Sequence, residues 1–598
     1  MMKKIIIGIL LVIGYLGVYS IHAEILSSDR RIDWRPGIPG GFPNKYFIVN
    51  VKDFGAIGDG TTDDYSAFTS AIDALAIGGG GVIYIPEGFY LIKNTLAMQN
   101  GIVFRGEGSE KTHLYFHLGN EEKNCIDFVK YDRGTWIKMM TGYVKNSKQI
   151  TVQDVSSFNI GDFVEIQQDN DPDIMYTQDQ WNKSWAQGAV GQILVVEAIN
   201  GNKLTLNNGL HIEYREELNP IIRRLGLVEY AGIEKLHLKR LDAGDGTTIL
   251  LKNAAYCRIM EIESEYSSRS HVNLETAFKC EIRDNYFHHS YVYNESEYGD
   301  GVICSFHATD NLIENNIFQR LRHSFMIHLG ASGNVFSYNY SFDVYDPNTW
   351  SPVDLALQGH YLNYNLFESN IIQEIGVANY GGPAGPGNTF FRNIIETKHV
   401  TISDHSHYQN IIGNVFSTDN QFIYIETSVY QTVVHGNTIR GIVEWDPNIS
   451  NHNFPFSYYL DSKPDFFGDK PWPLLGSDVS FSDILLPAKE RYENSITTGI
   501  QMAIPTDKEL RLTVYPNPFN PVTNISYDLP RSAVVEVKIY DINGKLISIL
   551  IDEYQEKGER IISWASKDSN GQRVPSGLYL IVLKSDNTIK SKKVLLIK

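Results

Sequence analysis

Seven asparagines recur at nearly constant intervals and limit the folds open to this chain. They are separated by 31, 23, 31, 23, 21 and 23 residues, and apolar residues alternate around each of them, as in NLIENNIF from Asn311. Alternation at a period of two indicates strands rather than helices. A repeat of this length cannot bury its own apolar face, so copies must stack as the rungs of a solenoid. The seven are Asn285, Asn316, Asn339, Asn370, Asn393, Asn414 and Asn437.

The rungs predict an all-β fold, a right-handed parallel β-helix. Parallel stacking at roughly 4.8 Å places equivalent residues above one another. The asparagines should therefore form a ladder at a turn, each amide bonded to the next. Cys257 and Cys280, also 23 residues apart, occupy the column of Asn311 and Asn334. We expect these cysteines to be stacked and buried, with a disulfide between adjacent rungs as the alternative.

Composition indicates a large acidic protein. The chain has 598 residues, a formal net charge of -18 and a pI near 5.4. It therefore lacks the broad basic surface that binds nucleic acid phosphates, and no nucleic acid partner is expected. Its four cysteines are too few for a disulfide framework.

The N-terminus predicts export. Two lysines precede an apolar run from Ile5 to Val18, and Ala23 ends the segment, a pattern typical of a signal peptide over residues 1–23. A retained membrane anchor is the alternative, although the run is short for a membrane-spanning helix. We expect no transmembrane segment after signal cleavage.

Residues 51–92 combine a Gly-Asp-Gly turn, a predicted helix, a Gly-rich turn and a strand ending in Ile-Pro-Glu-Gly. Thr62 or Asp63 should cap the helix, whose apolar stripe can close one end of a solenoid. A calcium loop built from the local aspartates is the alternative. This order resembles the start of pectate lyase superfamily proteins, in the rhamnogalacturonase-like and epimerase-like branch. The resemblance implies the β-helix fold and a carbohydrate substrate.

Residues 144–226 break the rung pattern. Apolar and polar residues alternate around Gly161-Asp162 and Asn200-Gly-Asn turns, which predicts a β-rich insertion of antiparallel hairpins. The loop between its halves, from Gln168 to Gln187, carries Trp181 and Trp185. This loop forms either a lid or an exposed loop.

The last residues, 510–598, predict a separate Ig-like β-sandwich, because short alternating strands and turn signals recur there. The phrases YPNPFNP from Tyr515 and VPSGLYLIVL from Val574 resemble the C-terminal sorting domain of the type IX secretion system. That resemblance implies a Gram-negative bacterium, a secreted or cell-surface protein and the type IX machinery as a partner. A generic carbohydrate-binding sandwich is the alternative. The β-helix domain then covers residues 45–490, and a linker covers 491–509.

Two intervals of 31 rather than 23 residues predict loops that leave the same corner of the coil, His288–Gly301 and Asp343–Asp354. They are two rungs apart and could form the walls of one cleft, roughly 10 Å wide. The glycine-rich stretch Gly381–Gly387 should leave room for a ligand near the backbone. Long loops on a rigid scaffold usually carry binding residues.

Side chains suited to uronate chemistry cluster near these loops. A β-eliminating lyase needs a base and a positive group that stabilises an enediolate, and histidines exchange protons near neutral pH. His360 is the best candidate for proton transfer, and Arg322 and Lys398 for charge neutralisation. The candidate catalytic residues are His360, Arg322, His323, His328, His405, Asp404, Asp354 and Lys398. The candidate substrate-binding residues are Tyr361, Tyr364, Tyr380, Tyr408 and His289.

We predict a secreted enzyme that degrades an extracellular, uronate-containing polysaccharide, with a lyase ahead of a glycoside hydrolase. A hydrolase needs two carboxylates across the scissile bond. Only Gly359-His360-Tyr361 echoes the motifs of polygalacturonases. A noncatalytic glycan-binding surface protein is a third alternative, and the metal, with Ca2+ one possibility, is left open. The carboxylates available to a hydrolase are Asp343, Asp346, Asp354 and Asp404.

Overall fold

The computed structural model describes most of the chain, which forms two compact units divided after Ile500. The predicted signal peptide, Tyr380 and Asp346 lie outside the described residues. The described ranges are 24–45, 47–293, 298–345, 353–378, 381–480, 485–498, 511–529, 533–542, 544–555, 558–585 and 588–597.

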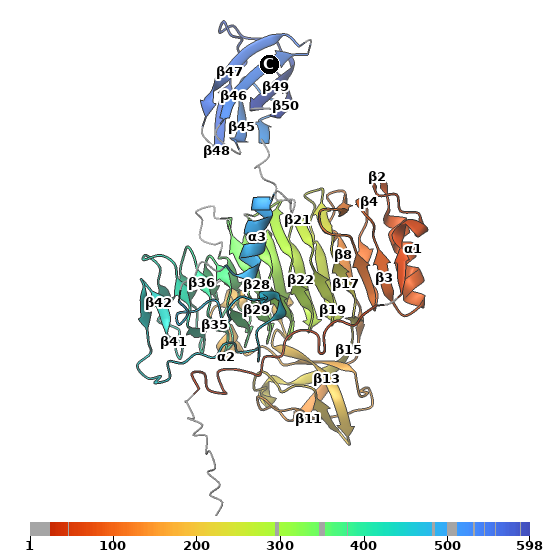
Figure 1. Cartoon of the computed structure of the whole chain (residues 1–598), viewed down its shortest axis with the longest axis vertical. Coiled ribbons are helices and arrows are strands. Elements are labelled where there is room, and N and C mark those ends of the chain that lie inside the picture. The colour runs from red at the N-terminus through yellow and green to blue at the C-terminus, as the bar shows by residue number, and fades with distance from the viewer. Residues whose placement is uncertain are drawn as a thin grey trace, which may run out of the picture. The chain divides into compact units, whose positions relative to one another are not determined.

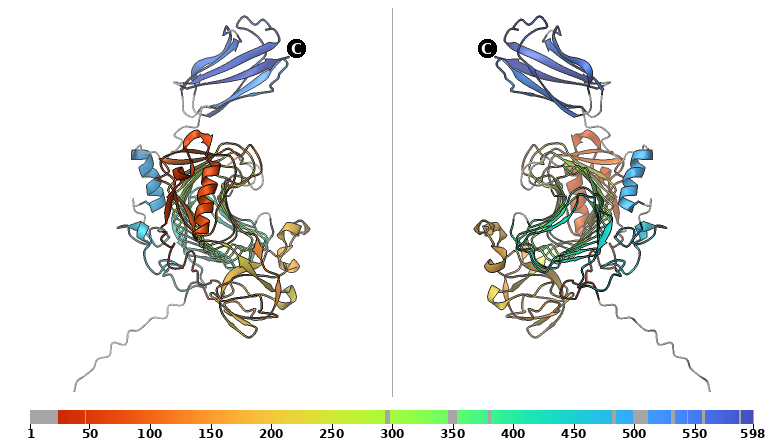
Figure 2. Two further views of the ribbon diagram at one scale, coloured as in Figure 1. Left: turned by 90° about the vertical axis from the view of Figure 1, so that its right-hand side faces the viewer. Right: turned by 90° about the vertical axis from the view of Figure 1, so that its left-hand side faces the viewer.

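The first unit is a right-handed parallel β-helix, as predicted (Figures 1 and 2). Each rung gives one strand to each of three long sheets, named here A, B and C. In one middle rung, β26 (Leu312–Glu314) lies in sheet A, β27 (Ile317–Gln319) in sheet B and β28 (His323–Ile327) in sheet C. The predicted insertion loops therefore leave the corner between sheets B and C.

Sheet A is formed by β1 (Ile48–Asn50), β3 (Gly81–Tyr84), β6 (Ile102–Arg105), β17 (Gly232–Glu234), β20 (Arg258–Met260), β23 (Glu281–Arg283), β26, β29 (Val335–Ser337), β32 (Leu366–Glu368), β35 (Thr389–Phe391), β38 (Asn410–Ile412) and β41 (Val433–His435). Sheet B is formed by β2 (Asp59–Asp63), β4 (Gly88–Ile92), β7 (Thr112–Phe116), β18 (His237–Arg240), β21 (Glu263–Ser267), β24 (Tyr286–Ser290), β27, β30 (Tyr340–Phe342), β33 (Ile371–Ile372), β36 (Ile394–Ile395), β39 (Val415–Phe416), β42 (Asn437–Ile439) and β43 (Ile442–Glu444). Sheet C is formed by β5 (Leu96–Ala97), β8 (Ile126–Val129), β16 (Val228–Glu229), β19 (Ile249–Ala255), β22 (Ser270–Phe278), β25 (Asp300–Ser305), β28, β31 (Leu355–Leu357), β34 (Ile375–Val377), β37 (Val400–Ile402) and β40 (Ile423–Ile425).

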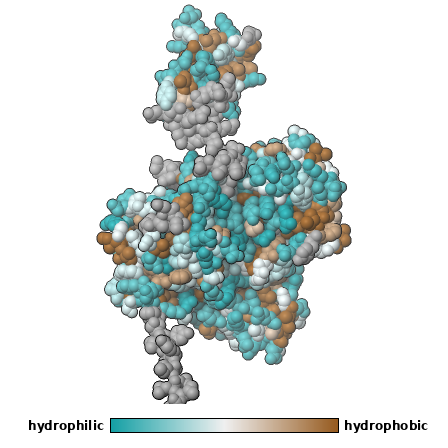
Figure 3. Space-filling view, viewed as in Figure 1, coloured by the Kyte–Doolittle hydropathy of each residue, from teal (hydrophilic) through white to brown (hydrophobic). Residues whose placement is uncertain are grey.

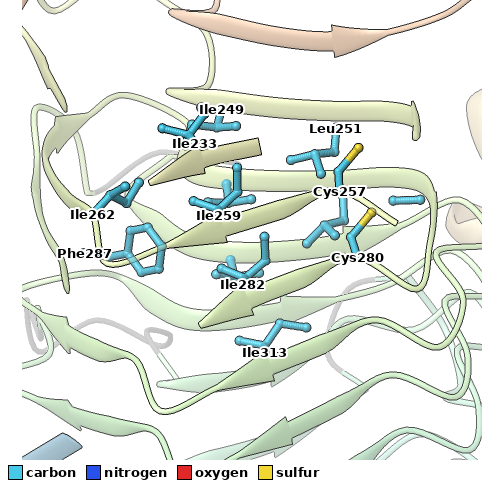
Figure 4. Packing of buried hydrophobic residues seen from close by; sticks show 14 of the residues in the cluster. Ile233, Ile249, Leu251, Cys257, Ile259, Ile262, Cys280, Ile282, Phe287 and Ile313 are labelled. Carbon is cyan, nitrogen blue, oxygen red and sulfur yellow. The ribbon is translucent and has the colours of Figure 1, made fainter. Parts of the chain in front are cut away.

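The interior of the coil is a column of stacked apolar side chains. Because the strands are in parallel register, Ile259 lies opposite Ile282, and Ile282 lies opposite Ile313 (Figure 4). Cys257 and Cys280 stack in the neighbouring column, fully buried and unbridged. The prediction of a buried cysteine stack is confirmed, and the disulfide alternative is wrong.

The asparagine ladder lies at the turn between sheets A and B. The side-chain amide of Asn316 donates to Oδ1 of Asn339 at 3.0 Å, and that of Asn339 donates to Oδ1 of Asn370 at 2.9 Å. A second ladder follows the turn between sheets C and A, with steps of 2.8, 2.9 and 3.0 Å. Both ladders satisfy polar groups that water cannot reach. The second ladder joins Asn311, Asn334, Asn365 and Asn388.

The helix α1 (Tyr65–Ile77) lies across the N-terminal end of the coil (Figure 2, left), with Phe68 fully buried. The N-cap position is Asp64 rather than Thr62 or Asp63, although the Asp63 carboxylate accepts the Tyr65 N–H at 3.1 Å. The Asp64 carboxylate instead accepts two backbone N–H groups of the preceding turn. Among the described residues, no group of three or more His, Cys, Asp or Glu side chains is placed to hold a metal ion.

An antiparallel sheet, the inserted domain, packs on one flank of the coil (Figures 1 and 2). It begins at Asp132, earlier than the predicted residue 144, because β9 and β10 both pair with β15. Its strands are β10 (Ile137–Thr141), β11 (Gln149–Val152), β14 (Lys203–Leu206), β13 (Gly191–Asn200), β12 (Phe163–Gln167), β15 (Ile221–Gly226) and β9 (Asp132–Arg133).

After the last rung, the chain runs back along the coil, and the last element of the first unit is the helix α3 (Pro487–Thr498). The Tyr492 ring lies 4.3 Å from that of Phe342 on sheet B, and Arg491 donates to the Asn315 carbonyl at 2.6 Å. The predicted linker over residues 491–509 is therefore wrong at its start. The helix is held because Tyr492 meets an aromatic surface that sequence spacing did not reveal.

Two glutamates on the outer face of sheet A, Glu314 and Glu368, are buried beneath this returning segment. The Tyr459 hydroxyl donates to Glu314 at 2.8 Å, and the Tyr458 N–H donates to Glu368 at 2.9 Å. Burial raises the pKa of Glu314 to about 6 and that of Glu368 to about 7. Both carboxyls therefore keep their protons where an exposed glutamate has lost its own.

The free energy of unfolding should consequently fall as the pH rises. A pKa raised above its ordinary 4.5 gives stabilisation that is complete below pH 4.5 and is lost as the pH passes about 7. A shift of one pKa unit corresponds to about 1.4 kcal/mol, so the raised pKa of Glu368 should contribute on the order of 3 kcal/mol to the free energy of unfolding at low pH. In thermal melts, Glu368→Gln should raise Tm above pH 7 and flatten its pH dependence. An equal effect of Glu444→Gln, at an exposed position, would argue against this origin.

The second unit is a β-sandwich around a core that includes Trp564, Val537 and Ile581. The surface of the first unit in Figure 3 is largely hydrophilic, and no described helix is long and apolar enough to cross a membrane. One sheet contains β44 (Arg511–Tyr515), β45 (Thr523–Leu529) and β48 (Gly558–Trp564), and the other contains β47 (Leu546–Gln555), β46 (Ala533–Asp541), β49 (Gly577–Ser585) and β50 (Thr588–Leu596).

Candidate functional site on the outer face of sheet C

Strand alternation gives sheet C a polar outer face. Val272 and Leu274 of β22 lie in the core, so Asn273 and Glu275 lie on the opposite face, where both are partly exposed. The Lys252 ammonium on the preceding rung lies 2.6 Å from the Glu275 carboxylate. We did not predict these polar residues, although the alternation of apolar and polar residues in SHVNLETAF from Ser270 indicates a strand with one polar face.

Strand β28 and the residue directly after it add two of the predicted histidines, His323 and His328, to this face. The Nδ1–H of His323 donates to the Val353 carbonyl at 2.5 Å, and the Gln358 amide donates to Nε2 of His323 at 3.2 Å. His328 follows Ile327, which is in the core and pairs with Leu357, so His328 and Gln358 are neighbours on adjacent rungs. Gln358 is therefore hydrogen-bonded to His323 and lies next to His328 in the register of the sheet.

Both histidines are neutral at ordinary pH. Burial, together with the Arg322 guanidinium, lowers the pKa of His323 to about 3. Burial, together with the charge of His360, lowers the pKa of His328 to about 3. His323 is fully buried and has both ring nitrogens bonded, whereas His328 is partly exposed. His328 is thus the better placed of the two to accept a proton from a ligand.

The prediction that Arg322, His323, His328, His360 and His405 line one cleft between the two insertion loops is not met by His360. Its ring is 4% exposed and meets the half-exposed Trp185 ring edge-on, with centroids 5.2 Å apart. Burial lowers the pKa of His360 to about 4, and the Trp181 backbone carbonyl, as an acceptor for the ring N–H, opposes part of this shift. The covering loop, residues 168–190 of the inserted domain, comes from a distant part of the sequence that the rung pattern cannot place.

The same loop fills the space that the glycines were predicted to leave for a ligand. A Cβ at Gly382 would lie 2.6 Å from the Met175 carbonyl and 3.2 Å from the Trp181 ring. A Cβ at Gly381 would lie 2.3 Å from Nδ1 of His360. The small residues therefore accommodate the protein's own loop.

Asp404 and His405 lie at the corner between sheets C and A that this loop covers. The Thr177 hydroxyl donates to Asp404 at 2.8 Å, and burial raises the pKa of that carboxyl. His405 lies 3.5 Å from Asp404, and its side chain is 48% exposed. The pair anchors the covering loop and is separate from His323.

The other three predicted catalytic residues, Arg322, Asp354 and Lys398, lie at the corner between sheets B and C. Arg322 directly precedes β28, is 8% exposed, and its backbone N–H donates to the Gly299 carbonyl at 2.7 Å. Asp354 is fully buried and accepts hydrogen bonds at 2.8 Å from Ser341 and from the Gln373 N–H. Its position fits a role in closing the corner. Lys398 forms an ion pair with Glu374 at 3.5 Å, next to β37 and three rungs from β28.

The predicted substrate-binding rings are dispersed. Tyr364 is covered, because its hydroxyl donates to the Asp29 carbonyl at 2.7 Å and Lys145 lies 3.9 Å over the ring. Tyr361 lines a small cavity under the inserted domain. His289 contacts His288 at the start of the corner between sheets B and C. Tyr408 is 42% exposed and remains available to a ligand.

A cluster of ionisable side chains on sheet B was not predicted. His113 and His237 contact each other at 2.9 Å, and His237 lies 3.3 Å from Glu265. Lys239 lies 2.8 Å from Glu265, and His288 lies 3.1 Å from Glu263. Most of these groups are buried, so they form a closed network rather than a surface for a polymer. The signal was again period-two alternation, as in HLKR from His237.

Comparison with known families follows the division into a coil and a sandwich. Residues 48–229 match the model described as rhamnogalacturonase A/epimerase, pectate lyase-like. Residues 513–598 match the secretion system C-terminal sorting domain. The two resemblances seen in the sequence are confirmed, and the sorting domain marks a secreted or cell-surface protein.

Relatives of known activity match short stretches. Mannuronan C5-epimerase AlgE1 of Azotobacter vinelandii is 37% identical over 83 residues, 13% of this chain and 6% of that protein. AlgE4 of the same organism is 37% identical over 81 residues, 12% and 15%. Alginate lyase 7, also from Azotobacter vinelandii, is 40% identical over 81 residues, 12% and 10%. The chain thus spans only 6%, 15% and 10% of the length of these relatives.

Similar solved structures cover more of the chain at low identity. The tailspike gp61 of Pseudomonas phage phi297 has a TM-score of 0.49 and 11% identity, with 86% of this chain and 98% of that chain covered. The A-module of AlgE4 from Azotobacter vinelandii has a TM-score of 0.27 and 13% identity, with 65% and 100% covered.

Proposed function

Because the chain joins a pectate lyase-like β-helix to a secretion sorting domain, we propose that it is an exported enzyme that cleaves a uronate-containing polysaccharide by β-elimination on the outer face of sheet C. The observation that carries this proposal is the partly exposed His328 on this polar face, with Gln358 next to it on the adjacent rung and His323 hydrogen-bonded to Gln358 at 3.2 Å. This face therefore carries a neutral base, His328, directly after β28 and a fixed positive charge, Arg322, directly before it, with five residues between them.

Each group has a defined task in the elimination. His328 takes the proton on the carbon α to the uronate carboxylate, and the Gln358 amide on the adjacent rung donates to the enediolate oxygen that develops. Arg322, at the other end of β28, binds the carboxylate of another uronate along the polymer. The electron pair then forms a carbon–carbon double bond and breaks the bond to the glycosidic oxygen. That oxygen receives the proton from His328, so no other reactant is consumed. A bound carboxylate also favours the protonated imidazole, which offsets the lowered pKa of His328.

C5 epimerisation is the second candidate, because it begins with the same proton removal. The support is the 81- and 83-residue similarity to mannuronan C5-epimerases. An epimerase returns a proton to the other face of the carbon and leaves the polymer intact. The two activities therefore differ in products and not in the first step.

The test is a screen of the purified mature protein against uronate-containing and neutral polysaccharides. A lyase produces new ultraviolet absorbance together with new reducing ends, which is the result expected. Reducing ends alone would indicate a hydrolase and would overturn the proposal. A changed uronate composition without cleavage would indicate an epimerase. No chemical change on any polymer would leave a glycan-binding protein.

The sorting domain should be required for export but not for folding. Removing residues 510–598 deletes the second compact unit and leaves the coil complete. In a Gram-negative host with type IX machinery, the truncated protein should accumulate in the periplasm with an unchanged coil Tm. Cell fractionation and immunoblotting give the distribution. Equal amounts of full-length and truncated protein outside the cell would refute the role of this domain.

A further inference from the structure

A groove of about 850 Å³ lies over sheet A, away from the candidate site on sheet C. The outer face of sheet A forms its floor. Its walls are the inserted domain, residues 33–39 and residues 459–466. Figure 1 shows the N-terminal segment running between the coil and the inserted domain. Small-molecule sites usually occupy about 300–1,000 Å³, so the groove can take several sugar units.

The floor presents fixed polar groups. Arg283 of β23 lies opposite Glu314 of β26, with 3.2 Å between the guanidinium and the carboxylate. The Tyr459 hydroxyl donates to the same carboxylate at 2.8 Å. Lys279 is 5% exposed, and its ammonium lies 3.5 Å from Asp310. These contacts hold donors and acceptors in place before a ligand arrives, which reduces the entropy cost of binding.

The walls add amides and aromatic rings. Asn208 of the inserted domain is partly exposed at the rim, next to the exposed Lys148. The Tyr256 ring stacks on that of Tyr230, with centroids 5.1 Å apart, which makes it a rigid surface at one end of the groove. Amide and guanidinium groups bond sugar hydroxyls, and aromatic rings pack on the apolar faces of sugar rings.

The charges of the groove favour an uncharged ligand. Above about pH 6, where Glu314 has lost its proton, four basic residues among the described lining residues are matched by four acidic ones. A polyanion would therefore meet as much repulsion as attraction. An apolar ligand would strip water from the floor charges without replacing their hydrogen bonds. The basic residues are Arg35, Lys148, Lys279 and Arg283, and the acidic residues are Asp33, Glu197, Glu314 and Asp465.

We propose that this groove is a second carbohydrate site, which binds an uncharged, hydroxyl-rich stretch of glycan independently of sheet C. It would hold the enzyme on a matrix of mixed polysaccharides while sheet C meets the acidic chains. The inference does not depend on the proposed elimination, because binding can be measured in a protein with no activity.

The test is calorimetric titration of the full mature chain with oligosaccharides from mannan, xylan and glucan, with oligogalacturonate as the acidic comparison. At least one neutral oligosaccharide should bind. Asn208→Trp, which fills the groove, and Arg283→Ala, which breaks the floor pair, should each weaken it at least tenfold. Lys203→Ala, on the same hairpin outside the groove, should not. Thermal melts confirm that each variant is folded.

Four results would overturn the proposal. They are no binding of any neutral oligosaccharide, unchanged affinity in both groove variants, equal loss in Lys203→Ala, or Arg283-dependent binding of oligogalacturonate alone. Binding that is lost in His328→Gln would place the ligand on sheet C and would also refute a separate site. If the protein shows no elimination activity, each of these binding results can still be interpreted, because none of them requires turnover.

Discussion

Replacing Asn339 by alanine is expected to destabilise the coil by on the order of 3–6 kcal/mol. Oδ1 of Asn339 accepts from the backbone and side-chain amides of Asn316 at 2.9 and 3.0 Å, and its Nδ2 donates to the Ile313 carbonyl at 2.9 Å. Alanine removes these three hydrogen bonds and the 2.9 Å bond from Asn339 to Asn370. The Asn316 side-chain amide keeps its bond to the Ile282 carbonyl, but each buried group that loses its partner costs about 1–3 kcal/mol. The change removes little apolar surface, so the loss comes from hydrogen bonding.

The measurement is the Tm and the urea midpoint of the coil transition, followed by circular dichroism. Asn453→Ala is the matched control, because this asparagine is exposed and lies outside both ladders. It should change stability by no more than about 0.5 kcal/mol. If the two variants melt at the same temperature, the hydrogen bonds of the ladder do not contribute to the stability of the coil, which would contradict the prediction.

His328→Gln is expected to lower turnover by about 10²–10⁴-fold, the usual contribution of a general acid or base. Glutamine can fill most of the imidazole volume on a partly exposed site, so Tm should change little. The expected signature is a fall in kcat with a small change in KM, because the proton transfer is lost while the substrate still meets Arg322 and Gln358.

His360→Ala is the matched comparison, since it tests the residue that sequence alone favoured. Its ring supports Trp185 and the covering loop, so any loss of activity should follow a lower Tm. Full turnover in His328→Gln, with loss in a stably folded His360→Ala, would return proton transfer to His360. The rate of appearance of unsaturated product measures both variants.

The coil could be predicted because the sequence pattern that produces each rung is short and recurs along the chain. The intervals between Asn316, Asn339 and Asn370 give the number of residues in each rung. Because adjacent rungs are in parallel register, residues at equivalent positions contact each other. The cysteine column follows from the same register. The two candidate histidines His323 and His328 lie at the start of β28 and directly after its end.

The sequence could not predict which site residues are covered, because the residues that cover them belong to a distant part of the chain. Trp181 and Trp185 reach the corner beside His360 from a domain inserted more than a hundred residues earlier. The glycines at 381 and 382 look the same in sequence whether a ligand or a tryptophan fills the space. Spacing within the coil contains no information about such packing.

The most direct measurement of the central claim is the crystal structure of the His328→Gln variant with a uronate oligosaccharide. The account predicts a chain of sugars on the outer face of sheet C, with the α carbon of one uronate facing position 328 and the carboxylate of another uronate beside Arg322. An oligosaccharide bound only elsewhere, with sheet C empty at a concentration that saturates binding in solution, would contradict it.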